Sequence, residues 1–276
     1  MNQPDIVLVH YSTAPGGIEV ILPQIIERLP QYSYSAFVIR PSHPGISVYK
    51  KDLPVSLHYG SFNSIIAGIK LFIYACKKRD SVFHVFNIGP FFLLMLRLAG
   101  ARCLIYSIHG TQYWKNGIER CVFRFLWRVS MSGDYIITAN SKFSRSVFND
   151  KVLSSREISL LYNPIDYERF KPMEGKIRSK YPHRIIYCGR LDKEKNLDEW
   201  IRIANLVLQR MPDILFELYG EGSQLPHLQD LINKYNLGGR IILKGFTSEP
   251  EKAMREADLL MFLSGYESFG NVVVES

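Results

Sequence analysis

The chain has 276 residues, of which 47% are hydrophobic and 22% are charged. This composition excludes a disordered or fibrous protein, and the length is sufficient for two globular domains. The formal net charge is +8, and residues 1–160 account for it, with 18 Lys and Arg against 9 Asp and Glu, whereas residues 161–276 carry 16 against 17. The first part should therefore attract an anionic partner, which could be a phosphate-bearing substrate, an acidic membrane surface or a nucleic acid.

The N-terminus and the cysteines indicate a cytoplasmic protein. No basic segment precedes the first apolar run, Ile6 to Val9, as it would in an export signal. The longest apolar segment, Phe91–Leu98, is far shorter than the roughly 20 residues needed to cross a bilayer. None of the four cysteines forms a CxxC pair. We expect all of them to be reduced thiols in the core.

Short apolar runs alternate with amphipathic segments along the chain. The runs are rich in β-branched residues, which is typical of strands buried on both faces of a parallel sheet. The predicted strands are Ile6–His10, Ser35–Ile39, Val55–His58, Val82–Phe86, Arg102–Ser107, Tyr135–Thr138, Ile158–Leu161, Arg184–Cys188, Ile214–Tyr219, Ile241–Lys244 and Leu259–Leu263. The predicted helices are Ile18–Leu29, Ile65–Lys78, Phe91–Ala99, Ile118–Met131, Asp198–Gln209 and Leu225–Tyr235.

This alternation predicts an α/β fold with helices on both faces of parallel sheets. The stretch Asn163–Pro182 interrupts it, with three prolines, a glycine and dense charge but no periodicity. We therefore predict a Rossmann-like domain at residues 1–162, a linker at 163–182 and a second Rossmann-like domain at 183–276. Such a pair would leave a cleft between the carboxyl edges of the two sheets, where ligands bind.

The strongest chemical pattern is a pair of glutamates near the C-terminus, Glu267 and Glu275, eight positions apart. Gly270 lies between them, and a helix is expected to begin near Asn271. A loop that enters a helix presents backbone N–H groups to an anion, and Glu275 would lie close enough to accept hydrogen bonds from ligand hydroxyls. From the spacing alone, two solvated surface glutamates are the more common arrangement.

Two loops in the second domain carry further candidates. Residues 189–196 follow a predicted strand and contain Arg190 and Lys195. These two side chains could flank a pyrophosphate, with the Arg190 guanidinium donating two hydrogen bonds and the Lys195 ammonium acting as a compact positive charge. An ordinary charged loop is the alternative. After the next strand, Gly220 and Gly222 would let the backbone pass close to a nucleotide, although packing of a tight turn explains a G-x-G pattern equally well.

In the first domain, Gly16 and Gly17 follow the first strand and open a helix, where the backbone could approach a phosphate or sugar. His109 ends another strand and could hold a sugar hydroxyl, or it could be a hydrogen-bonded structural residue. The sequence contains neither a full dinucleotide-binding fingerprint nor a Walker motif nor an Asp-x-Asp pair. We therefore expect no metal site and no bound cofactor.

Taken together and in this order, the motifs resemble those of glycosyltransferase family 4, the retaining enzymes of the GT-B kind. The matching motifs are Gly16-Gly17, His109-Gly110, Asn163-Pro-Ile-Asp166, Gly189-Arg190 with Lys195-Asn196, Gly220-Glu-Gly222, and Glu267 with Glu275, the last of which resembles the family's E-x7-E motif. The resemblance covers nearly the whole chain. It implies two Rossmann-like domains that face each other across a cleft. Family members continue well past the second glutamate, so the resemblance also implies a second domain that is truncated at the C-terminus.

The resemblance implies roles for the candidate residues. The residues implied in catalysis, which would contact the transferred sugar, are His109 and Glu267. The residues implied in donor binding are Arg190, Lys195, Glu275, Gly220, Phe269, Gly270 and Asn271. The implied acceptor or phosphate loop is Gly16 and Gly17. No metal ligand is implied, because the family needs no metal. No cofactor is implied either, because the nucleotide sugar is a substrate.

The implied reaction moves a hexose, with retention of configuration, from a nucleoside diphosphate sugar to a glycan or glycolipid acceptor in bacterial cell-surface polysaccharide synthesis. Acceptor hydroxyl and leaving phosphate would share one face of the sugar, so that no enzyme nucleophile is required. The basic first domain would rest on the anionic inner face of the cell membrane through the helices Ile65–Lys78 and Ile118–Met131. The alternative is that these two helices simply face solvent and do not contact a membrane.

Other functions remain compatible with the sequence. Another GT-B enzyme, such as a nucleotide-sugar epimerase or a phosphorylase, would yield a free sugar nucleotide or a sugar phosphate instead of a glycoside. A non-catalytic sugar-nucleotide-binding protein is a further alternative. A nucleic-acid partner is not expected, because the aromatic residues do not alternate with Lys and Arg as a stacking platform requires.

Overall fold

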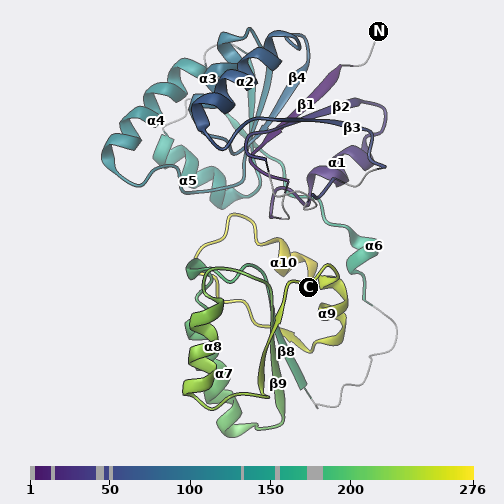
Figure 1. Ribbon diagram of the computed structural model, residues 1–276, viewed down its shortest axis with the longest axis vertical. Helices are drawn as coiled ribbons and strands as arrows, with labels where there is room; N and C mark the ends of the chain where they lie inside the picture. Colours follow the sequence, from purple (N-terminus) through teal and green to yellow (C-terminus); the bar gives the residue numbers. More distant parts are fainter. Residues whose placement is uncertain are drawn as a thin grey trace. The chain divides into compact units, whose positions relative to one another are not determined.

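The computed structural model describes residues 4–13, 16–41, 47–49, 52–131, 134–152, 156–172 and 183–276. The chain divides into two compact units, Met1–Pro164 and Ile165–Ser276 (Figure 1). This division falls inside the stretch 163–182, for which the sequence predicts a linker. Residues 173–182 of that stretch lie outside the described part of the chain.

Within the described residues, the first unit is built on a parallel sheet of seven strands in the order β3-β2-β1-β4-β5-β6-β7. The strands are β1 (Asp5–His10), β2 (Ser33–Val38), β3 (Val55–Tyr59), β4 (Val82–Phe86), β5 (Cys103–Ile108), β6 (Tyr135–Ala139) and β7 (Ile158–Leu160). From β1 the chain winds outward first to β3 and then, through β4, to β7. This is the doubly wound arrangement, which gathers the loops after the strands at one edge of the sheet.

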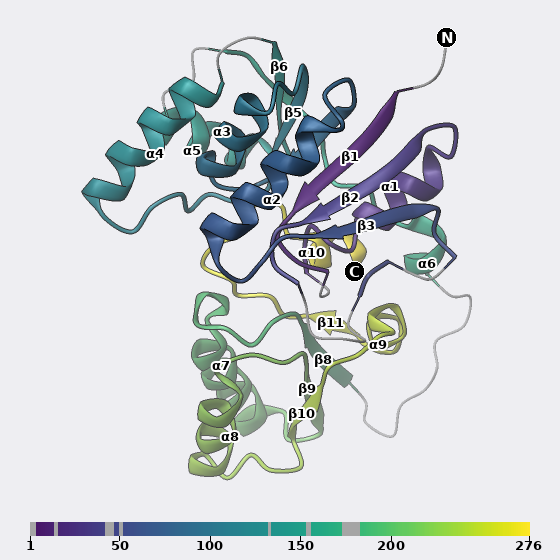
Figure 2. The ribbon, with the colours of Figure 1, turned by 45° about the horizontal axis from the view of Figure 1, so that its top comes forward.

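Helices cover both faces of this sheet. They are α1 (Leu22–Arg28), α2 (Ser64–Cys76), α3 (Pro90–Leu98), α4 (Gly117–Ser130) and α5 (Lys142–Val152). Figure 2 shows α1 on the opposite side of the sheet from α2. Leu8 of β1 packs with residues of α1, whereas its neighbours Val7 and Val9 belong to the core formed with α2 to α5. Successive side chains of a strand point to opposite faces, so a continuous apolar run suits a sheet that is covered on both.

Side-chain caps fix where two of these helices begin. Asn63 precedes α2, and its Oδ1 accepts a hydrogen bond from the backbone N–H of Ile65 at 2.9 Å. Asn116 precedes α4 and accepts one from Glu119 N at 2.9 Å, while Glu119 Oε2 accepts one from Lys115 N at 2.6 Å. Such caps satisfy backbone donors that have no partner within the helix.

Within the described residues, the second unit is built on a four-stranded parallel sheet in the order β10-β9-β8-β11. The strands are β8 (His183–Cys188), β9 (Ile214–Tyr219), β10 (Ile241–Gly245) and β11 (Leu259–Leu260). The helices are α6 (Tyr167–Phe170), α7 (Leu197–Arg210), α8 (Leu225–Lys234), α9 (Pro250–Glu256) and α10 (Asn271–Glu275), with a 3₁₀ turn at Lys193–Lys195. Trp200 of α7 and Leu228 of α8 belong to the main core, and Ala253 of α9 belongs to a smaller one.

The predicted α/β class with parallel sheets is confirmed, and every predicted strand is present. Two bounds differ clearly from the prediction. The last strand ends at Leu260 instead of Leu263, and the first helix begins at Leu22 instead of Ile18. The second difference follows from Pro23, which occupies the first turn of α1, where its missing N–H costs no hydrogen bond.

Three helices were not predicted: α5, α6 and α9. The sequence of α5 shows no clear hydrophobic periodicity, because one of its three buried positions is a serine. These positions are Ser144, Phe148 and Val152. Helices α6 and α9 have only four and seven residues, too few to show a period.

The expectation that all cysteines lie in the core is wrong for Cys103 and Cys121, which are exposed. Burial raises the pKa of Cys188 to about 12, so its thiol is protonated and unreactive.

Candidate functional site

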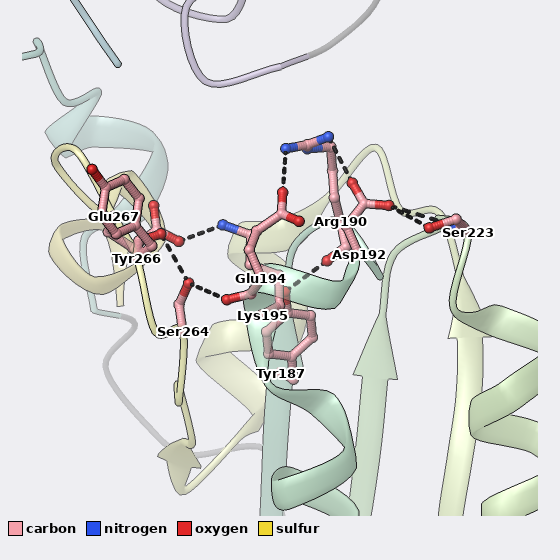
Figure 3. A network of polar contacts seen from close by, with 9 residues as sticks. All are labelled: Tyr187, Arg190, Asp192, Glu194, Lys195, Ser223, Ser264, Tyr266 and Glu267. Carbon is pink, nitrogen blue, oxygen red and sulfur yellow. Dashed lines mark hydrogen bonds and ion pairs between the residues drawn. The ribbon is translucent and has the colours of Figure 1, made fainter. Parts of the chain in front are cut away.

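The candidate residues of the second unit lie on the loops that follow strands β8, β9 and β11, and in the short helix α10 that follows the last of these loops. These strands are parallel, so their carboxyl ends meet at one edge of the sheet. Figure 3 shows that side chains from all three loops form one connected polar network there. The network joins Tyr187, Arg190, Asp192, Glu194, Lys195, Ser223, Ser264, Tyr266 and Glu267.

The glycines of the first two loops allow the backbones to pack directly against each other. A Cβ atom on Gly220 would lie 1.8 Å from the carbonyl oxygen of Gly189, and one on Gly222 would lie 2.4 Å from that of Leu191. Gly220 also has a φ of +145°, which other residues rarely adopt. Packing between the two loops therefore accounts for both glycines of the G-x-G pattern. The donor-binding role of Gly220 stays a prediction.

Arg190 projects from the loop after β8 and is held by carboxylates. Its Nη1 lies 2.6 Å from Asp192 Oδ2, and its Nη2 lies 3.2 Å from Glu194 Oε1. Asp192 is tied to the neighbouring loop, because its Oδ1 accepts hydrogen bonds from Ser223 N at 3.3 Å and Ser223 Oγ at 3.2 Å. The guanidinium side chain is nevertheless 65% exposed, so an anion from solvent can reach it.

Lys195 links the loop after β8 to the loop after β11. Its Nζ lies 2.5 Å from Glu267 Oε1, and the two side chains are only 13% and 30% exposed. The backbone carbonyl of Glu194 accepts hydrogen bonds from Gly265 N at 3.2 Å and from Ser264 Oγ at 3.4 Å, which hold the same two loops together. The structure therefore brings Arg190, Lys195 and Glu267 to one place, although they are up to 77 positions apart in the sequence.

The loop-to-helix corner after Glu267 is present as expected. Gly270, with a φ of +78°, precedes the short helix α10, and Phe269 and Asn271 beside it are half-buried. Glu275 lies in α10 and is also half-buried. Burial raises the pKa of Glu275, the positive charge of Arg169 opposes this shift, and the negative charge of Glu251 adds to it.

Arg169, Asp192 and Glu194 were not recognised as site residues in the sequence. Arg169 lies in α6, where its Nη2 approaches Glu251 of α9 at 2.8 Å and donates to the carbonyl of Ser248 at 2.9 Å. Its spacing from the other candidates gives no signal for this contact. The alternating charges of the sequence Arg190-Leu-Asp-Lys-Glu-Lys195 were visible, and they were the one available indication that Arg190 would be paired.

In the first unit, His109 follows β5 at the carboxyl edge of the larger sheet. Its ring lies 5.6 Å from that of Phe86, centroid to centroid. Burial lowers the pKa of His109 to about 4, so the imidazole is neutral at physiological pH. A Cβ on the following residue, Gly110, would lie 2.7 Å from Asn87 Nδ2, so the Asn87 side chain would have to shift to admit a larger residue there.

Gly16 and Gly17 lie in the turn between β1 and α1. The carbonyl of Gly16 accepts a hydrogen bond from Val20 N at 3.2 Å, and nothing lies within 4 Å of where a Cβ on Gly17 would be. These two glycines and His109 belong to the first unit, whereas the other candidates belong to the second. In the described part of the chain, no group of three or more His, Cys, Asp or Glu residues is arranged to hold a metal ion.

Comparisons with known proteins agree with this fold. Residues 171–276 match the model of the family Glycosyl transferases group 1. The chain is 29% identical, over 232 residues, to the N-acetylgalactosamine-N,N'-diacetylbacillosaminyl-diphospho-undecaprenol 4-alpha-N-acetylgalactosaminyltransferase of Campylobacter jejuni. This alignment covers 78% of the chain and 62% of the relative, so the chain spans less than two-thirds of that protein's length.

Two further relatives cover almost the whole chain. The UDP-Gal:alpha-D-GlcNAc-diphosphoundecaprenol alpha-1,3-galactosyltransferase of Escherichia coli is 19% identical over 294 residues, which is 98% of the chain and 76% of the relative. The crystal structure of HepE from Anabaena, in complex with UDP and glucose, superposes with a TM-score of 0.76 at 18% identity, covering 99% of the chain and 78% of HepE.

The fold is thus the α/β fold of GT-B glycosyltransferases, and the C-terminal part of the chain matches the group 1 family. Assignment to glycosyltransferase family 4 in particular, the reading of Glu267 and Glu275 as an E-x7-E motif, and the roles of the individual site residues stay predictions.

Proposed function

We propose that the protein is a retaining hexosyltransferase that uses a nucleoside diphosphate sugar as donor. The observation that carries this proposal is the cluster of Arg190, Lys195 and Glu267 at the carboxyl edge of the second sheet, inside the region that matches group 1 glycosyl transferases. Two cations and a carboxylate suit a ligand that has a diphosphate next to a hydroxyl-rich sugar.

The chemistry follows from the charges of these groups. Departure of a nucleoside diphosphate leaves negative charge on its terminal phosphate, which Arg190 and Lys195 would stabilise. Glu267 would accept hydrogen bonds from hydroxyls of the transferred sugar, and Glu275 would accept them from the ribose. The acceptor oxygen would attack the anomeric carbon from the face that the phosphate leaves, and its proton would pass to that phosphate. His109, being neutral, would hydrogen-bond a sugar hydroxyl.

The acceptor that we propose is a lipid-linked glycan, in cell-surface polysaccharide synthesis. The Campylobacter jejuni and Escherichia coli relatives are named for acceptors that are linked to undecaprenol through a diphosphate. The positive charge of residues 1–160 suits an acceptor of this kind, because both the diphosphate and the lipid surface around it are anionic.

A feature of α4 supports a peripheral position on the inner face of the membrane. Besides its buried face, the helix has an exposed apolar stripe formed by Ile118, Val122, Phe125 and Val129, with Ile118 79% and Phe125 65% exposed. Arg120 and Arg128 of the same helix are exposed as well. An exposed apolar stripe on a helix that also carries exposed arginines is typical of a helix that lies in a membrane interface. None of the helices in the described ranges is long and apolar enough to cross a membrane.

A transfer assay tests the proposed reaction. The protein is incubated with UDP-, GDP- and ADP-hexoses and a short-chain undecaprenyl diphosphate-linked sugar, and the products are identified by mass spectrometry. A glycoside in which the new bond retains the donor's anomeric configuration is expected. A free epimerised sugar nucleotide or a sugar phosphate would instead support an epimerase or a phosphorylase, and binding without turnover would support a non-catalytic sugar-nucleotide-binding protein.

A further inference from the structure

The cations of the proposed donor site are paired with carboxylates of the protein itself. Figure 3 shows Arg190 between Asp192 and Glu194, and Lys195 against Glu267. Glu267 has a proposed role of its own in binding the sugar, but the two carboxylates around Arg190 have none. A carboxylate beside a diphosphate is repelled by it, so these two acids require a separate explanation.

The two acids hold Arg190 in different ways. Asp192 is 20% exposed and makes the shorter contact, 2.6 Å, and its other oxygen is bound by the backbone and hydroxyl of Ser223. Glu194 is 43% exposed and makes the longer contact, 3.2 Å. Among the described residues, the Glu194 carboxylate has a polar contact with Arg190 alone. Asp192 is thus fixed in place, whereas Glu194 can swing into solvent.

Ion pairs of exposed side chains are weak, because water solvates both partners well and ordering the two side chains costs entropy. A diphosphate carries more negative charge than a carboxylate and therefore offers Arg190 a stronger partner. The Nη2 atom can exchange Glu194 for a phosphate oxygen without moving away from Asp192, which still orients the guanidinium through Nη1.

We propose that Glu194 competes with the donor's diphosphate for Arg190, and that Asp192 is the positioning residue that keeps the guanidinium aimed at the site. This inference rests on the proposed donor site. Glu194 weakens the binding of the donor and of the nucleoside diphosphate product alike, and it returns to Arg190 as the product leaves. The acid therefore speeds product release at the expense of affinity.

Titration calorimetry with UDP, GDP and ADP as probes tests the assignment on the full chain. We expect Glu194→Gln, which removes the charge and keeps the shape, to lower the Kd of the nucleotide that binds wild type by about two- to fivefold. Asp192→Asn should raise the Kd, because Arg190 loses its anchor. Glu199→Gln is the matched control, since Glu199 is an exposed glutamate of α7 paired with Arg202 at 3.0 Å, and it should leave the Kd unchanged.

A second background separates competition for Arg190 from a general change in charge. With Arg190→Ala in place, Glu194→Gln should no longer tighten binding. If Glu194→Gln binds no more tightly than wild type, or if it tightens binding equally in the Arg190→Ala background, the competition is overturned while the donor site stands. Absence of nucleotide binding by folded wild type, with thermal unfolding as the check, would remove the donor site and the competition together.

Discussion

The surroundings of Lys195 differ from those of an ordinary surface lysine. It is 13% exposed and connects two loops through Glu267, whereas Lys193, two positions earlier, is exposed. A half-buried cation opposite a single carboxylate retains a strong attraction for a diphosphate.

We expect Lys195→Ala to weaken UDP binding by about tenfold or more, since hydrogen bonds to charged groups contribute about 1.5–3 kcal/mol. Lys193→Ala should change it little. Calorimetric titration of both variants is the measurement. Equal losses in the two variants would mean that the loop attracts nucleotide through its overall charge, without the specific contact proposed for Lys195.

Three histidines of the first unit are held neutral. Burial lowers the pKa of His10 and of His109 to about 4, and burial together with the nearby His109 lowers that of His84 to about 3. Their ordinary pKa is 6.5. Below that pH the unfolded chain binds protons that the folded chain does not bind, so the stabilising effect of neutral histidines is present above pH 6.5 and is lost as the pH falls towards 4.

The free energy of unfolding should therefore decrease between pH 6.5 and 4. Urea denaturation at several pH values measures it. His84→Gln, which can preserve the 2.7 Å contact with Ser107 Oγ, should show a smaller decrease. His227→Gln is the control, because His227 is half exposed and lies on α8 in the other unit. If the free energy of unfolding of His84→Gln depends on pH in the same way as that of wild type, His84 does not cause the loss of stability at low pH.

At the scale of elements, the contact between the loops after β8 and β9 is decisive for the site. The hydrogen bond from Leu191 N to Glu221 O, 2.8 Å long, and the one from Gln224 N to Leu191 O, 2.9 Å long, hold the loops at a separation that admits no side chain between them. The position of Arg190 depends on this contact, because Asp192 reaches Ser223 across it.

Gly220→Ala should destabilise the protein by about 1–3 kcal/mol, because the new methyl group overlaps the Gly189 carbonyl and the backbone is strained for alanine. Gly238→Ala is the control, since nothing lies within 4 Å of its Cβ position. Thermal unfolding of both variants checks the difference. UDP binding by Gly220→Ala should also weaken, and unchanged binding would show that the loop contact does not set the position of Arg190.

At the scale of the whole molecule, the uneven distribution of charge predicts where the protein works. We expect the excess of Lys and Arg in residues 1–160 to attract an anionic surface, and the exposed apolar stripe of α4 to insert into it. Both contributions should be visible in a single vesicle experiment.

The protein should co-sediment with vesicles that contain phosphatidylglycerol and much less with pure phosphatidylcholine, and salt should reduce the bound fraction. A variant that combines Ile118→Glu with Phe125→Glu should no longer co-sediment with the phosphatidylglycerol vesicles. Leu206→Glu is the control, because Leu206 is 58% exposed on α7 of the second unit. Retention of the Ile118→Glu, Phe125→Glu variant would contradict a membrane role for α4.

The sequence by itself determined the parts of this protein that depend on local pattern. Continuous β-branched runs identified the strands to within a few residues, because a strand covered on both faces must be apolar along its length. The same patterning placed Arg190, Lys195 and Glu267 on loops that follow strands, and Glu275 in the helix after the last of these loops. Short or polar helices such as α5 and α9 were missed, because α5 has a serine at one of its three buried positions and α9 has too few residues to show a period.

Only the tertiary structure decided which charges meet. The pairs Lys195 with Glu267 and Arg169 with Glu251 join residues 72 and 82 positions apart, and no local pattern encodes such pairs. The structure also showed that Gly220 and Gly222 make room for a neighbouring backbone, and that Arg190 is occupied by Asp192 and Glu194. The physical reason is the same in each case: chain topology sets the distances between loops, and those distances decide which electrostatic and steric contacts form.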